Sequence, residues 1–176
     1  MNPKRSIHKV HVINKGSVLC NSCGFCCNSL LFSEVKFRKS DPVKLLISLG
    51  LNKIKGKNAF SQPCAVYSGT TCAIYHQRPK YCQKFECRLL GKILTDSVSI
   101  KEALRIIKKV NIQTQVVKEI MQNLGQSNET LALSCRLGEI MAQPYDPLDS
   151  PQKNRFRRRL MIQSQKLMLL LETHFL

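Results

Sequence analysis

Eight of the nine cysteines in this sequence lie between residues 20 and 87, and their spacing is typical of metal ligands. The first four form the run Cys20-Asn-Ser-Cys23-Gly-Phe-Cys26-Cys27. Two-residue spacers let successive sulfurs converge on one centre, and Gly24 favours the turn between them. A C-x2-C-x2-C start also opens the ferredoxin type of iron–sulfur motif, in which a fourth cysteine can serve a different centre.

Cys26 and Cys27 are adjacent, and neighbouring side chains diverge in extended or turn backbone. The pair therefore predicts ligands to two sites, or one ligand and one thiol beside it, whereas a vicinal disulfide is disfavoured in a reducing compartment. The gaps between the later cysteines match no standard zinc finger. Spacing alone thus predicts a cysteine cluster without naming its metal. These later cysteines are Cys64, Cys72, Cys82 and Cys87.

A second motif runs from Cys72 to Cys87 and reads CAIYHQRPKYCQKFEC. Together the two motifs, over about residues 20 to 90, resemble the YkgJ-type CxxCxxCC family, described as zinc- or iron-chelating proteins. Its best-understood relatives are flagellin lysine N-methylases, which are similar in carrying such a cluster, so the resemblance implies ligands but no reaction. The sequence departs from the family pattern at Gln83, where arginine is usual, and at Gln62, where glycine is common. The implied ligand set is Cys20, Cys23, Cys26, Cys27, Cys64, Cys72, Cys82 and Cys87.

Several residues are expected beside the ligands rather than among them. Four thiolates around zinc or a four-iron core leave a charge of about −2, so Arg78 is expected to contact the cluster. Tyr75 is expected next to it, and Tyr81 and Phe85 could shield the metal from water, although core packing would explain these rings equally well. His76 is disfavoured as a ligand because eight thiols already suffice. Cys135 is expected to be a buried structural thiol on a helix.

The chain has 176 residues with 28 Lys and Arg against 11 Asp and Glu, for a net charge of +17. The charge is spread along the chain and predicts an anionic partner such as RNA, DNA or an acidic protein, or a basic protein with no specific partner. The N-terminus has no apolar signal region, and no apolar run approaches a membrane span, so a cytoplasmic location is expected. In a reducing cytosol, the cysteines favour metal binding over disulfides. Motifs for nucleotide binding and zinc peptidases are absent.

The elements that must position these residues change in character along the chain. A basic arm at 1–19 precedes the cysteine region at 20–94, where Asp41 and Pro42 predict the start of a short helix that ends at Gly50. The run 53–71 is polar and lacks the periodicity to fold alone. A helical region follows at 95–176. The expected fold is mainly α with a loop-rich, metal-stabilised cysteine core, in a small single domain.

Three helices are expected in that helical region. Ser99 and Glu102 have capping-box spacing before a long amphipathic helix to Leu124, with a possible break near Asn111. A shorter helix is predicted over 128–141, then an irregular connection through Pro144, Pro147 and Pro151, then a helix over 152–174. In the last helix, Phe156, Leu160, Leu167, Leu170 and Leu171 share an inward side, and an exposed basic strip opposite comprises Arg155, Arg158, Arg159 and Lys166.

The residues favour a metal-binding protein that holds an iron–sulfur cluster, with zinc as the other metal considered, through eight cysteines. Crowded cysteines after a C-x2-C-x2-C start suit a multi-iron core better than isolated zinc. One alternative is a zinc-stabilised basic module that binds nucleic acid or associates with the ribosome. Another, which rests on the resemblance, is a protein-modification factor related to the flagellin methylases. The sequence itself contains no recognisable methyl-donor site.

Overall fold

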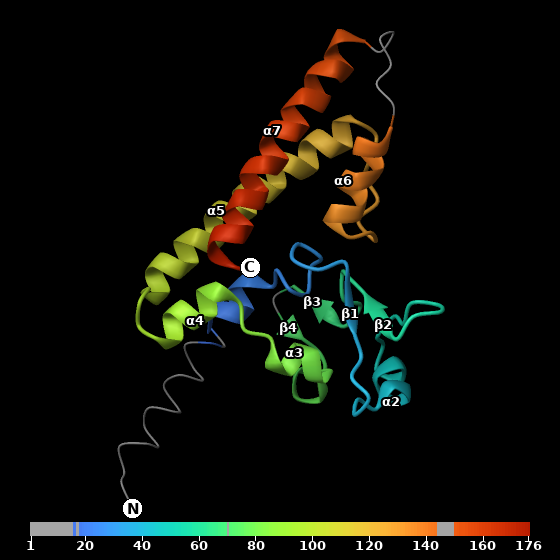
Figure 1. The fold of residues 1–176 in the computed structure, drawn as a ribbon, viewed down its shortest axis with the longest axis vertical. Coiled ribbons are helices and arrows are strands. Elements are labelled where there is room, and N and C mark those ends of the chain that lie inside the picture. Colours follow the sequence, from blue (N-terminus) through green and yellow to red (C-terminus); the bar gives the residue numbers. More distant parts are fainter. Residues whose placement is uncertain (1–15, 17, 70, 144–149) are drawn as a thin grey trace, which may run out of the picture.

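The computed structural model describes residues 16, 18–69, 71–143 and 150–176. The predicted mainly α fold is confirmed, with a small cysteine-rich part beside a larger helical part (Figure 1). The cysteine-rich part contains β1 (Glu34–Lys36), α2 (Val43–Ser48), β2 (Ala59–Ser61), β3 (Tyr67–Ser68), β4 (Thr71–Cys72), the 3-10 helix η1 (Tyr75–Gln77) and α3 (Lys80–Lys84). The helical part contains α4 (Arg88–Leu94), α5 (Ile100–Asn123), α6 (Leu133–Ala142) and α7 (Pro151–His174).

The two long helices α5 and α7 pack against each other in opposite directions and form the main core (Figure 1). Apolar residues recur every three or four positions, so Val110 and Val117 on α5 are buried with Leu160 and Leu167 on α7. Ser99 caps α5 as predicted, because its hydroxyl accepts a hydrogen bond from the Glu102 amide at 3.2 Å. Periodicity and cap together explain why α5 forms where the sequence predicts it.

The possible break at Asn111 does not occur, and α5 is continuous through this position. Asn111 lies on the exposed side of the helix, where its polar side chain costs no burial. The neighbouring Gln113 stabilises the pair of helices, since its amide donates to the backbone oxygen of Gln163 at 2.9 Å. The polar residues near Asn111 therefore lie on an exposed part of α5 and do not end the helix.

A second, smaller core lies within the cysteine-rich part. Its strands pair antiparallel, β1 with β2 and β3 with β4, and the β1–β2 register aligns Val35 with Phe60. The polar run 53–71 is therefore partly ordered by a partner elsewhere in the chain, because β2 lies within it and pairs with β1. The buried members of this core are Phe37, Leu46, Leu51, Phe60, Val66 and Ile74.

Several predicted boundaries were wrong. The Asp41 side chain does not cap α2; it is buried and accepts hydrogen bonds from the amides of Arg38 at 2.7 Å and Lys80 at 2.9 Å. The shorter helix begins at Leu133 instead of 128, since Asn128 forms a turn by accepting from the Thr130 amide. Pro151 opens α7 rather than belonging to the connection before it.

The rest of that connection, at 144–149, and residues 1–15 and 17 of the basic arm lie outside the described residues. Within the part that is described, no helix has both the length and the apolar character to cross a membrane.

Candidate metal centre

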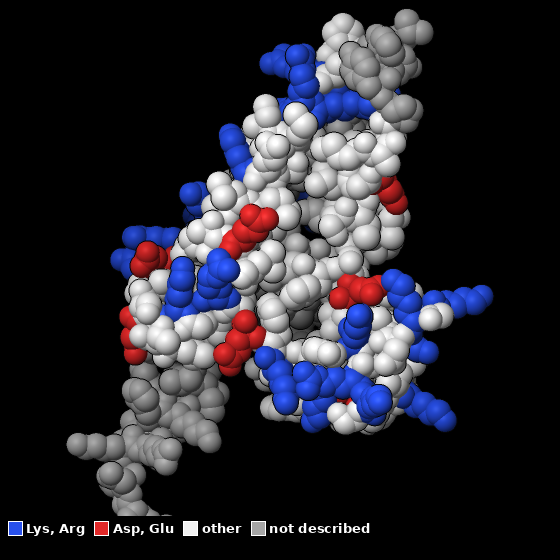
Figure 2. Space-filling view, in the orientation of Figure 1, with Lys and Arg blue, Asp and Glu red and all other residues white. Residues whose placement is uncertain are grey.

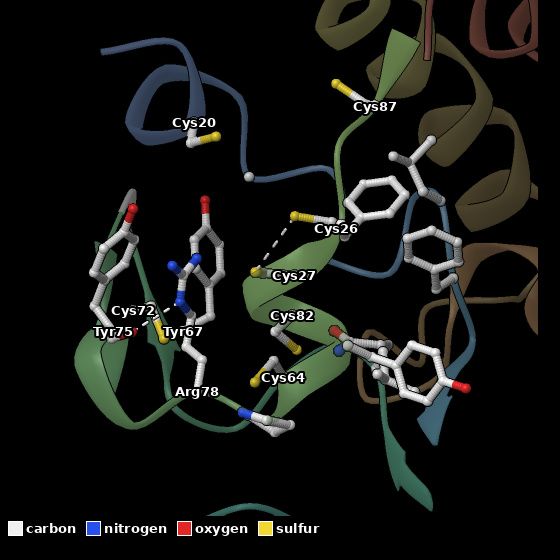
Figure 3. Close-up of a pocket in the computed structure, with 18 of the residues that line it drawn as sticks. Cys20, Cys26, Cys27, Cys64, Tyr67, Cys72, Tyr75, Arg78, Cys82 and Cys87 are labelled. Carbon is white, nitrogen blue, oxygen red and sulfur yellow. Dashed lines mark hydrogen bonds between the residues drawn. The ribbon is translucent and has the colours of Figure 1, made fainter. Parts of the chain in front are cut away.

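All eight predicted ligand cysteines line one cavity of about 670 Å³ between the two parts of the molecule. Figure 3 labels all of them except Cys23. Segments that are far apart in the sequence meet there: the helical turn and loop at 18–27, the β3–β4 hairpin, α3 and the start of α4. The other lining residues are largely apolar or aromatic. The cavity thus offers sulfur donors in surroundings that limit contact with water.

The first four cysteines are brought to the cavity by a turn at Gly24. Its φ of +65° is a conformation that other residues adopt only with strain. The amide of Cys27 donates to the Gly24 oxygen at 2.8 Å, which closes the turn. Because of this turn Cys26 and Cys27 do not diverge fully, and their sulfurs lie 3.7 Å apart.

The Tyr67 side chain lies directly over Gly24, so closely that a Cβ at position 24 would overlap the tyrosine hydroxyl. Tyr67 also lines the cavity. Tyr67 was not among the predicted site residues, and no local signal in the sequence identifies it, since the contact joins positions 43 apart in the numbering. The turn that aligns the cysteine motif is therefore fitted to the β3–β4 hairpin.

Each of the later four cysteines is held by a different element. Cys64 is fixed to the first motif, because its amide donates to the Cys27 oxygen at 2.8 Å. Cys72 ends β4 and pairs with Tyr67, and Cys82 lies in α3, whose first amide is bound by the buried Asp41. Cys87 caps α4, with its sulfur accepting from the Leu90 amide at 3.4 Å.

Burial raises the pKa of most of these thiols. It raises the pKa of Cys82 to about 12 and also raises those of Cys23, Cys64 and Cys87. The Cys26–Cys27 contact acts on the two thiols in opposite directions: a hydrogen bond from Cys27 lowers the pKa of Cys26 to about 7, while the pKa of Cys27 is raised. A buried thiolate needs positive charge, and a bound metal ion supplies it while releasing protons.

Arg78 lies on the wall of the cavity, with its guanidinium carbon 3.6 Å from the centre of the Tyr75 ring. Its Nε donates to the backbone oxygen of Tyr75 at 2.8 Å, so the two residues predicted to lie beside the ligands hold each other in place. The positive charge of Arg78 helps to lower the pKa of Cys26. Arg78 can therefore offset the negative charge of thiolates in this cavity.

Two other aromatic residues lie at the rim. Tyr81 is half exposed under Arg38, whose guanidinium carbon is 4.5 Å from the ring centre. Phe85 meets Phe32 edge to face, with ring centres 5.0 Å apart. Both line the cavity.

The remaining candidates lie away from the thiols. His76 is exposed and is not among the residues that line the cavity. The prediction of a buried structural Cys135 was wrong, because this thiol is exposed on α6. The adjacent Arg136 is the buried residue, at 2% exposure. The side of α6 that faces the protein interior therefore includes Arg136 and not Cys135.

The donors fit a thiophilic metal in type but do not converge on a single point. Among the described residues, no three His, Cys, Asp or Glu side chains are close enough together to hold one metal ion. The eight cysteines instead line a cavity. Zinc and iron–sulfur clusters both take cysteine thiolates, so the donor set suits either.

Comparisons with known proteins bear on this site. Those with curated proteins and with solved structures each found no match. A family model matches residues 19–111, and its description is "Putative zinc- or iron-chelating domain". The match includes every cysteine that lines the cavity, and it extends into α5. With more than half of its length matched, the chain belongs to the CxxCxxCC family.

Proposed function

We propose that the protein binds an iron–sulfur centre through its eight clustered cysteines, with zinc as the alternative metal. The observation that carries this proposal is that all eight thiols, drawn from five separate segments, line one cavity while the ninth cysteine lies outside it. Packing against the two cores does not explain why thiols from separate segments face one cavity. Metal binding gives them one.

Iron–sulfur chemistry is favoured by the crowding of eight cysteines after a C-x2-C-x2-C start. A zinc ion takes only four donors at about 2.3 Å. A polynuclear core with its own inorganic sulfide spans a wider space and takes one thiolate at each iron. The apolar lining and Arg78 would then influence the stability and potential of such a core.

The test is anaerobic purification of the full chain, followed by analysis of iron, acid-labile sulfide and zinc, and by a visible spectrum. We expect iron and sulfide in similar amounts and a broad visible absorption that bleaches on reduction. A colourless protein with stoichiometric zinc would select the alternative metal. A folded protein with eight free thiols and neither metal would contradict the proposal.

A second candidate function, binding of nucleic acid, is favoured by one observation. Arg155, Arg158 and Arg159 are all exposed on one side of α7, as the helical spacing predicted, while Leu160 is buried. Such a row of cations can contact phosphates in any sequence of RNA or DNA. This function would be compatible with a structural metal in the cavity.

A further inference from the structure

We propose that the cavity holds two separate metal centres, one bound by Cys20, Cys23, Cys26 and Cys87 and the other by Cys27, Cys64, Cys72 and Cys82. This inference rests on the proposed function, since it assumes that the thiols bind metal. It adds the number of centres and the partition of the ligands.

Packing of the thiols against two different cores is the first argument. Cys23 and Cys87 pack against the large core of the helical part. Cys87 is also the N-cap of α4, whose Leu89 and Ile93 are buried in that core. The other group packs against the small core of the cysteine-rich part and comprises Cys64, Cys72 and Cys82. Each core therefore supports its own set of sulfurs.

The adjacent pair Cys26–Cys27 divides between these sets. Cys27 is joined to the second set through its backbone oxygen, which accepts from the Cys64 amide at 2.8 Å. In Figure 3, the Cys27 sulfur lies toward Cys64 and Cys82, whereas the Cys26 sulfur lies on the side of Cys20 and Cys87. The two sulfurs lie 3.7 Å apart but face different sets of cysteines, which explains why a motif would carry two consecutive cysteines.

The number of donors agrees with this division. A structural zinc ion and a four-iron cluster each take four cysteines. The eight thiols that line the cavity make two complete sets, and Cys135 on α6 is not needed. The 3.7 Å between the sulfurs of Cys26 and Cys27 places the two centres next to each other. A single centre would leave four thiols in the cavity without a ligand role.

The experiment uses the full chain, purified without oxygen, and two matched double variants. Cys23→Ser with Cys87→Ser removes half of the first set, and Cys64→Ser with Cys72→Ser removes half of the second. Cys135→Ser is the control. Metal per chain is measured by elemental analysis, and mass spectrometry after alkylation reports which thiols remain protected.

We expect each double variant to keep about half of the metal of the unmodified chain, with the thiols of the intact set still protected. The control should keep all of it. Loss of metal from only one double variant, or complete loss from both, would overturn the partition. The unmodified chain provides a test that does not depend on variant folding, because metal for one centre together with four freely alkylated thiols would also overturn it. Absence of metal from the unmodified chain would instead contradict the proposed function.

Discussion

At the scale of single residues, the contact between Gly24 and Tyr67 connects the cysteine motif to the rest of the fold. Gly24 has a positive φ and closes the turn between Cys23 and Cys26. The Tyr67 hydroxyl occupies the space where any larger residue would carry its Cβ. Position 24 is therefore restricted twice, by its backbone conformation and by its neighbour.

Replacing Gly24 with Ala should lower both the stability of the protein and its metal content. The left-handed conformation costs an L-residue about 1–2 kcal/mol, and the Tyr67 ring must also move away from the cavity wall. Gly56→Ala is the matched control, since Gly56 has a φ of +76° but no heavy atom within 4 Å of an added Cβ. Chemical denaturation and metal analysis should show a larger loss for Gly24→Ala. Equal effects of the two substitutions would show that the Tyr67 contact is unimportant.

At the scale of elements, α6 is held by a buried arginine. Arg136 is 2% exposed, and its guanidinium lies 3.6 Å from the Glu129 carboxylate and donates to the backbone oxygen of Gln126 at 3.3 Å. Glu129 also accepts from Lys118 of α5 at 3.1 Å. The connection between α5 and α6 is thereby fixed by charge as well as by the burial of Leu133 and Ile140.

Glu129→Gln should destabilise the protein by about 1 kcal/mol at neutral pH, because the carboxylate that neutralises Arg136 is removed from a partly exposed pair. The hydrogen bond from Lys118, together with the charge of Arg136, lowers the pKa of Glu129 below its usual value of 4.5. Stability from this group is present above pH 4.5 and is lost as the pH falls through the lowered pKa.

The difference in unfolding free energy between the unmodified chain and Glu129→Gln should therefore shrink below pH 4.5. Denaturant titrations at several pH values measure it. Glu119→Gln is the control, because Glu119 is exposed on α5 and accepts only from Gln115 in its side-chain hydrogen bonding. A constant difference across this pH range would show that Glu129 does not act through its charge.

At the scale of the whole molecule, the two parts differ in how they can be stable. The helical part has a continuous core over α4 to α7. The cysteine-rich part buries only six residues in its own core. Burial of each such side chain contributes roughly 1.5–3 kcal/mol, whereas ordering each residue of the segment costs about 1–2 kcal/mol. The small core alone is therefore insufficient.

Removal of the metal should loosen the cysteine-rich part while the helices persist in part. Structural zinc contributes about 10–16 kcal/mol to folding in small domains, which is comparable to what burial of the six side chains of the small core contributes. Hydrogen exchange with and without a chelator should show lost protection at β1 to α3 and retained protection in α5 and α7. Equal protection of β1 to α3 in both states would contradict a metal-dependent fold.

The positive charge is distributed over both parts. Figure 2 shows Lys and Arg side chains gathered over the cysteine-rich part as well as along the helices. Exposed lysines of the cysteine-rich part include Lys39, Lys44 and Lys53. Binding to a polyanion can thus involve the lysines of the cysteine-rich part or the arginines of α7. Substitutions at each surface can distinguish their contributions.

Replacing Arg155, Arg158 and Arg159 with Gln should leave the fold intact, since all three are exposed. If they contact single-stranded RNA, affinity should fall and the plot of log K against log salt should become less steep. The magnitude of its negative slope should decrease by about 2, at about 0.7 per phosphate contact. Circular dichroism checks the fold, and binding is measured at several salt concentrations. The same replacement at Lys39, Lys44 and Lys53 tests the other surface. Unchanged affinity and slope after the arginine replacement would remove this strip from the nucleic-acid hypothesis.

The sequence by itself determined the features that depend on local pattern. The cysteine spacing identified the residues that line the cavity, the Ser99 cap and apolar periodicity identified α5 and α7, and Gly24 identified the turn. Each signal lies within a few residues, because helices and turns are specified by short-range hydrogen bonds and by side-chain period.

Only the tertiary structure decided which distant segments meet. It placed Tyr67 over Gly24, and it placed Asp41 at the start of α3, where its carboxylate accepts from the Lys80 amide. It ordered a polar run around a second core. It also exposed Cys135 and buried Arg136. It also separated the thiols between two cores. None of these features has a local signature in the sequence, since each depends on contacts between distant segments. The free energy of such contacts is set by the packing of whole elements and not by the propensities of single residues.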